Sequence, residues 1–144
     1  MSTIDNFRRQ LKAVPANLER AHIETVVHRF MSTYPTKDVA TRVSVFAEEL
    51  RFEDPAGLRF ASNKEELEKF FQDTIDSGYA IRFFPDRLIV DGDEALQIAR
   101  VWLQVHDSDP ILLLLHLHFV FDSDGLVTQL RTFFDEDSVS VSAI

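Results

Sequence analysis

The stretch Phe52-Glu53-Asp54-Pro55-Ala56-Gly57 decides how this chain is organised, because it ends a short apolar strand in a proline turn. We expect the strand over residues 50–53. A residue that precedes proline is disfavoured in the α region, so Asp54 should be extended at the strand end. Its carboxylate then has two possible tasks: to cap the turn by accepting backbone N–H bonds, or to face a pocket.

Upstream of this turn the pattern is helical. Apolar side chains recur at helical spacing after Asn17, which we expect to cap the helix, and Pro35 is expected to end it. A second, shorter helix is expected over residues 38–46. Residues 1–16 form a polar N-terminal extension in which Phe7, Leu11 and Val14 could make one stripe of a short helix.

Downstream, Ser62-Asn63-Lys64-Glu65 matches a capping box and opens a third helix that ends at Gly78. The pattern then changes to strands, and Asp91-Gly92 is a strong hairpin signal. The expected strands are 81–90, 95–106, 111–121 and 126–134. The prediction is an α+β domain over residues 17–136, with three helices packed in the concave face of a curved, mainly antiparallel sheet, and a flexible tail over 137–144.

Composition narrows the function. A chain of 144 residues with 45% hydrophobic content and 13 Phe forms one domain with a bulky core or a pocket for a flat apolar ligand. The net charge of −9 disfavours nucleic acid and anionic membrane surfaces as partners. No cysteine is present, the N-terminus lacks a secretory pattern, and the apolar run 110–121 is too short to span a bilayer. We therefore expect a cytoplasmic protein without membrane or nucleic-acid partners.

The turn and the helix before it resemble the ketosteroid isomerases of the nuclear-transport-factor-two-like (SnoaL-like) superfamily. Val26-Val27-His28-Arg29-Phe30 and Glu53-Asp54-Pro55-Ala56-Gly57 match that family's Val-x-Arg-Tyr helix and Glu-Asp-Pro-x-Gly turn, with 24 positions between Phe30 and Asp54. The resemblance implies a cone-shaped fold and an Asp54 that shuttles protons on a hydrophobic carbonyl substrate. Desolvation in a Phe-lined cavity would raise the pKa of such a carboxylate and make it a better base.

The same resemblance shows a chemical difference. The family's oxyanion-binding Tyr falls on Phe30, its second Asp on Leu117 and a further Tyr on Phe71, so three polar groups are replaced by apolar ones. Tyr34, one helical turn after Phe30, either supplies a displaced donor or simply packs at the helix end. The substrate-binding residues implied are Phe30, Tyr34, Phe71, Leu117, Leu130 and Phe134.

Two further pairs of residues were candidates for other roles. His116 and His118 share one face of their strand, but no third ligand is evident, so we expect no metal; the resemblance puts them on the outer face of the sheet. Arg100 and Trp102 also share a face, and an inward Arg100 could pair with Asp54, as in epoxide hydrolases of this fold. Otherwise both face outward at a dimer contact.

The functional expectation is therefore an isomerase-like or cyclase-like protein that binds a small hydrophobic molecule, needs no cofactor and forms a homodimer through the outer sheet face. Three alternatives stay open. The first is a binding module that has lost catalysis, the second is an epoxide hydrolase or cyclase on the same fold, and the third is a purely structural dimer.

Overall fold

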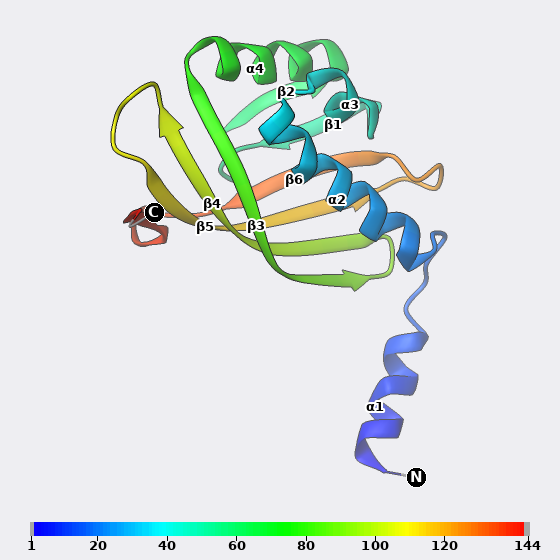
Figure 1. The fold of residues 1–144 in the computed structure, drawn as a ribbon. Helices are drawn as coiled ribbons and strands as arrows, with labels where there is room; N and C mark the ends of the chain where they lie inside the picture. Colours follow the sequence, from blue (N-terminus) through cyan, green and yellow to red (C-terminus); the bar gives the residue numbers. More distant parts are fainter. Residues whose placement is uncertain (1, 143–144) are drawn as a thin grey trace.

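The computed structural model describes residues 2–142, which form four α-helices around one seven-stranded sheet (Figure 1). The helices are α1 (Thr3–Lys12), α2 (Arg20–Thr36), α3 (Val39–Ser44) and α4 (Lys64–Asp76), followed late in the chain by a 3-10 turn, η1 (Glu136–Ser138). The strands are β1 (Phe46–Glu53), β2 (Arg59–Asn63), β3 (Tyr79–Asp91), β4 (Glu94–Val105), β5 (Ile111–Phe121), β6 (Val127–Phe133) and β7 (Val139–Val141).

The sheet has the order β2-β1-β6-β5-β4-β3, and β7 pairs with β5. All pairs are antiparallel except β1 with β6, which run parallel. The sheet curves, and α2, α3 and α4 occupy its concave side (Figure 1). The expected fold class, an α+β cone with helices packed against a curved sheet, is confirmed.

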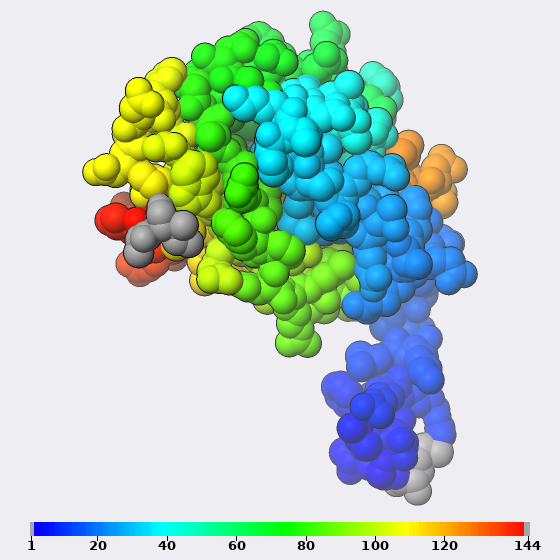
Figure 2. Space-filling model, in the orientation of Figure 1, coloured from blue at the N-terminus to red at the C-terminus, as the bar shows by residue number. Residues whose placement is uncertain are grey.

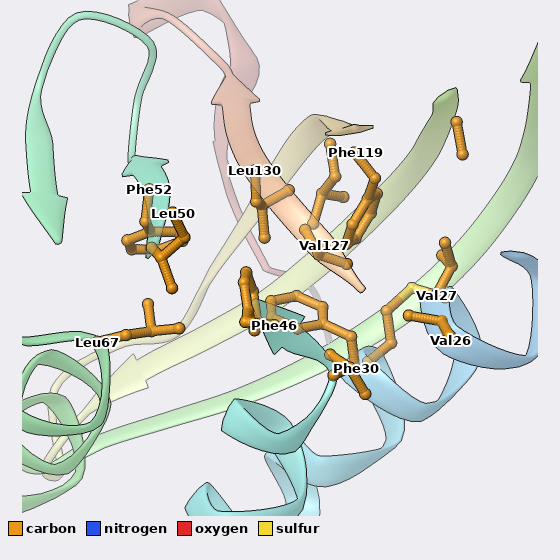
Figure 3. Close-up of a cluster of buried hydrophobic side chains, with 14 of the residues drawn as sticks. Val26, Val27, Phe30, Phe46, Leu50, Phe52, Leu67, Phe119, Val127 and Leu130 are labelled. Carbon is orange, nitrogen blue, oxygen red and sulfur yellow. The ribbon is translucent and has the colours of Figure 1, made fainter. Parts of the chain in front are cut away.

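The core lies between α2 and the sheet, because α2 turns one apolar face inward at helical spacing. Phe30 is 1% exposed and sits among aromatic rings, with ring centroids 6.1 Å from Phe46 and 5.6 Å from Phe119. Figure 3 shows Phe30 and Phe46 meeting in the cluster that also holds Leu130. Burial of these large side chains is the main force that holds α2 against the sheet.

Both ends of α2 differ from the sequence prediction. Glu19, not Asn17, occupies the N-cap position, and the Asn17 backbone N–H instead donates to the Asp93 carboxylate at 2.9 Å. Pro35 lies inside the last turn, and the helix continues to Thr36 before Lys37 ends it in a left-handed conformation (φ 57°). Pro35 lacks the backbone donor that would otherwise bond the Met31 carbonyl, and the helix ends one residue later.

The start of α4 is displaced by one residue from the predicted capping box. Asn63 is the N-cap, with its side chain accepting from the Glu66 N–H at 2.9 Å, and the Glu66 carboxylate accepts from the Ser62 N–H at 2.8 Å. At the other end Gly78 adopts φ 86°, one residue beyond the C-cap. A side chain there would also collide with the His106 ring.

Three other regions depart from the prediction. The second helix ends at Ser44 because β1 begins at Phe46, and β2 was not predicted. Of the predicted flexible tail, 137–144, residues 137–141 belong to η1 and β7, which pairs with β5, while residues 143–144 lie outside the described part. The predicted N-terminal helix forms as α1, buries none of its side chains and projects from the body (Figure 2).

Candidate functional site

A cavity opens between α2, α4 and the concave face of the sheet. It consists of an outer chamber of about 450 Å³ and an inner chamber of about 120 Å³. The two chambers share Tyr34, Asp54, Ile81, Leu103 and Phe134 in their walls, so they lie next to each other. The inner chamber is lined mainly by aromatic and aliphatic side chains, and the outer one carries more polar groups at its mouth.

Asp54 lies at the junction of the two chambers, where β1 ends. Its carboxylate accepts a hydrogen bond of 2.5 Å from the hydroxyl of Thr132, a buried residue of β6. Desolvation by the surrounding apolar walls raises the pKa of Asp54, and the Thr132 hydrogen bond opposes that rise. The result is a carboxylate that accepts a proton more readily than an exposed aspartate does.

The neighbouring residue Glu53 caps the turn, a task that the sequence left open for Asp54. Its carboxylate accepts the N–H of Gly57 in the proline turn and pairs with Arg51 at 2.9 Å and Arg131 at 3.3 Å. The Gly57 hydrogen bond, helped by the arginines, lowers the pKa of Glu53. Within residues 2–142 the Asp54 side chain accepts no backbone N–H, so the turn is closed without it.

Tyr34 lines both chambers, and its phenol interacts electrostatically with Asp54. Desolvation raises the pKa of Tyr34 far above its usual range, Arg42 lowers it somewhat, and the Asp54 carboxylate raises it further. Tyr34 therefore remains a protonated hydrogen-bond donor at any physiological pH. Its hydroxyl has no hydrogen-bond partner among the described residues, which leaves the donor available inside the cavity.

The residues expected to bind substrate are not all at the cavity. Phe30 and Leu117 line the inner chamber, Phe71 lines the outer chamber, and Phe134 lines both. Leu130 lines neither chamber, because it is fully buried in the core cluster behind them.

Two residues that the sequence analysis missed belong to the site: Thr132, which bonds Asp54, and Arg42 of α3, which lines the outer chamber. Thr132 lies two residues after Leu130 on β6 and shares its face, so the period of two could have placed it inward. Arg42 lies three residues after the buried Val39, but no charged residue would ordinarily be assigned to a buried helix face.

The candidates on other strands face away from the cavity. Arg100 is exposed and pairs with Asp86 at 3.3 Å, so the predicted alternative of an inward Arg100 paired with Asp54 is wrong. Trp102 shares this outer face because it lies two residues further along β4. His118 pairs with Glu94 at 2.7 Å on the outer face, and no group of three metal-ligating side chains occurs in the described part of the chain.

The SnoaL-like domain family matches residues 27–138, and the chain belongs to this family. The match includes Phe30, Tyr34, Asp54 and Thr132. No curated protein is similar enough to count as a relative. No helix in the described residues has the length and apolar character needed to cross a membrane.

Three solved structures illustrate the fold. The epoxide hydrolase/cyclase-like enzyme SalBIII, which has a role in pyran ring formation in salinomycin, superposes with a TM-score of 0.74 at 16% identity, covering 88% of this chain and 99% of that one. An LEH-like epoxide hydrolase of Mycobacterium tuberculosis gives 0.72 at 17% identity, covering 82% and 86%. A computationally designed 17-OHP binder gives 0.72 at 15% identity, covering 81% and 95%. At such identities the likeness concerns the fold.

Proposed function

We propose that the protein catalyses proton transfer on a small hydrophobic carbonyl compound, with Asp54 as the base and Tyr34 as the hydrogen-bond donor to the carbonyl oxygen. The observation that carries this proposal is that two adjacent carboxylates have different hydrogen-bond partners and therefore different tasks. Glu53 closes the turn, while Asp54 is held by one hydroxyl at the wall of an apolar cavity. A carboxylate kept in such a place without a structural task is a candidate for chemistry.

The proposed reaction has two proton transfers. Asp54 removes a proton from the carbon next to the carbonyl, the C–H electron pair forms a carbon–carbon double bond, and the carbonyl oxygen gains negative charge. Tyr34 donates a hydrogen bond to that oxygen, and the protonated Asp54 then returns its proton to a second carbon. A raised pKa suits Asp54 to this work, because it brings the base closer to the acidity of the substrate.

The size of the cavity supports a fused-ring or similarly bulky substrate. Ligand pockets typically measure roughly 300–1,000 Å³, and the outer chamber alone has about 450 Å³. The designed 17-OHP binder of the same fold supports the idea that such a cone can enclose a ligand of this kind.

A second candidate is the opening or cyclisation of an epoxide, which the activities named for SalBIII and the Mycobacterium tuberculosis enzyme bring forward. The raised pKa of Asp54 favours a protonated fraction that could deliver a proton to an epoxide oxygen. Arg100 would play no part in this reaction, since it lies on the outer face of the sheet.

The deciding experiment measures solvent deuterium incorporation into a 3-oxo-Δ5-steroid by mass spectrometry, with parallel incubations on a hydrophobic epoxide. Exchange should occur with the unmodified protein and fall to background in Asp54→Asn. Asp73→Asn is the matched control, because Asp73 also lines the outer chamber but pairs with Lys69 at 2.6 Å. Epoxide turnover without exchange would favour the second candidate, and tight steroid binding without either reaction would favour a binding module.

We also propose that two copies associate through the outer sheet face, as expected from the leucine-rich strand. Leu114 of β5 is 43% exposed and Phe133 of β6 is 41% exposed, and both lie on this face with the Trp102 ring nearby on β4. Exposed apolar patches of this kind usually mark an interface. Light scattering should report a dimer at micromolar concentration and a monomer for Leu114→Glu; a monomeric unmodified protein would contradict the proposal.

A further inference from the structure

The outer chamber contains a buried positive charge that the proposed proton transfer does not use. Arg42 is 2% exposed, yet its guanidinium lines the chamber. The guanidinium carbon lies 3.5 Å from the centre of the Tyr34 ring and 4.6 Å from the centre of the Phe71 ring. Two aromatic faces thus hold the cation in place and shield it from bulk water.

The guanidinium is only partly satisfied by the protein. Nε donates to the Thr33 hydroxyl at 2.9 Å and Nη2 donates to the Thr33 carbonyl at 3.2 Å. These bonds tie α3 to the end of α2. Within the described residues Nη1 has no acceptor and no carboxylate forms an ion pair with Arg42. Planar guanidinium groups bind carboxylates through paired N–H donors, and Arg42 retains donors for such a contact.

Tying two helices together does not account for the charge. A neutral amide could donate to the same threonine, whereas a buried cation that forms no ion pair is costly because it loses its hydration, even with the charge of Asp38 acting on it. That loss lowers the pKa of Arg42, although arginine remains protonated in proteins. A buried cation that faces an open chamber is better explained by an anion that enters the chamber.

The other charges around the chamber are consistent with an anionic ligand. Lys37 also lines it, and the acidic Asp73 at its mouth is neutralised by Lys69. Asp54 is the second carboxylate of the wall and lies at the junction with the inner chamber. Arg42 and Lys37 thus place two cations in the wall of the outer chamber, in a protein whose net charge is −9.

We infer that the substrate is an amphipathic carboxylate, whose anionic group binds Arg42 while its apolar body occupies the inner chamber beyond Tyr34. This inference names the substrate class for the proposed function, and the part of it that concerns a reacting carbonyl rests on that proposal. Tyr34 interacts electrostatically with both Arg42 and Asp54, so a carboxylate bound at Arg42 would lie beside the same phenol that donates to the reacting carbonyl.

The test compares two probes of similar size and shape, the anionic 2-naphthylacetate and the neutral 2-naphthylacetamide, by calorimetric titration at neutral pH. The unmodified protein should bind the acid about ten- to a hundredfold more tightly than the amide, as expected for hydrogen bonds to a charged group. Arg42→Gln should reduce this preference to about threefold or less, and Arg42→Lys should keep part of it. Arg100→Gln, which removes a positive charge from the outer face, should leave the preference unchanged.

Several results would overturn the inference. Equal affinity for acid and amide in the unmodified protein would do so. A purely structural role predicts that Arg42→Gln weakens both probes by the same factor, and a site centred on Lys37 predicts that Lys37→Gln, not Arg42→Gln, removes the preference. If the Arg42 variants do not fold, the Arg42 Nε–H resonance of the unmodified protein should shift on titration with the acid and stay in place with the amide; an unmoved resonance refutes the site.

The binding test is separate from the proposed reaction. Acid preference without deuterium exchange into either the neutral steroid ketone or a hydrophobic keto acid would leave the anion site standing and remove the catalytic proposal. Exchange on a neutral ketone without acid preference would have the opposite meaning.

Discussion

Removing the Tyr34 hydroxyl should separate catalysis from stability. In Tyr34→Phe the ring remains, so its contacts with Phe30 at 5.4 Å and Phe83 at 4.8 Å between centroids, and its place beneath the Arg42 guanidinium, are all retained. The hydroxyl has no partner among residues 2–142, so no protein hydrogen bond is broken. The change therefore removes only a donor that points into the cavity.

The expected size of the effect follows from what else could take over. Among the described side chains that line the inner chamber, Tyr34 and Thr132 can donate a hydrogen bond, and the Thr132 hydroxyl already donates to Asp54. Loss of a single oxyanion donor typically lowers a rate by about 10²–10³, or about 2.7–4 kcal/mol. The free energy of unfolding should change by less than about 1 kcal/mol, because an unpaired buried hydroxyl contributes little to stability.

Deuterium exchange into a 3-oxo-Δ5-steroid and urea unfolding, measured on the same preparation, test both halves of this prediction. Tyr79→Phe is the matched control, since Tyr79 is the second of the two tyrosines and lies at the outer chamber. It should keep both its exchange rate and its stability.

An exchange rate for Tyr34→Phe within threefold of the unmodified protein would refute the assignment of Tyr34 as donor. So would a parallel loss of stability and activity, because it would show that the hydroxyl holds the fold together. In the first case the oxyanion would have to be stabilised from the outer chamber, where Arg42 is the strongest donor.

Three other predictions concern stability. Burial raises the pKa of Asp54, so the charge of Asp54 destabilises the folded state above that pKa, and this cost disappears on acidification. Asp54→Asn should therefore be more stable than the unmodified protein at pH 8, by about 1.36 kcal/mol per unit of pKa displacement. In urea titrations this advantage should shrink toward about pH 4. Glu53 has a lowered pKa, so its ionised form stabilises the folded state above the ordinary glutamate pKa, and this stabilisation is lost as the pH falls through the lowered pKa. Glu53→Gln should be less stable than the unmodified protein at neutral pH and equally stable near about pH 3. A stability difference that persists in acid would contradict this. Deleting residues 1–12 should leave the free energy of unfolding within about 0.5 kcal/mol, since α1 buries no side chain, and a larger loss would mean that α1 docks in solution.

The helices and long strands could be predicted from the sequence because their signals are local. The apolar spacing of α2 and the Asp91-Gly92 turn each depend on a few neighbouring residues. The cap of α4 could not be resolved in this way, because Ser62 and Asn63 are both good caps with a glutamate three residues further on. β2 has no clear alternation, and its strand conformation comes from pairing with β1.

The site shows the same limit more sharply. Asp54 could be identified because strand end and proline turn are adjacent in sequence. Arg42 could not, because its role depends on the packing of α3 against the end of α2 and on the rings of Tyr34 in α2 and Phe71 in α4. Leu130 was assigned to the pocket by resemblance, but it is buried in the core cluster and lines neither chamber.

The parallel pairing of β1 with β6 links the packing of the core to the charge environment of Asp54. Two successive residues of β6 serve two successive residues at the end of β1: Arg131 bonds Glu53, and Thr132 bonds Asp54. A shift of β6 by one residue would bring Arg131 opposite Asp54, but it would also turn every side chain of β6 to the other face of the sheet and take Leu130 out of the core. An ion pair with Arg131 would lower the pKa of Asp54 and make it a poor base. The register that buries Leu130 is thus the same register that keeps this cation away from Asp54, so the packing of the core also protects the chemistry.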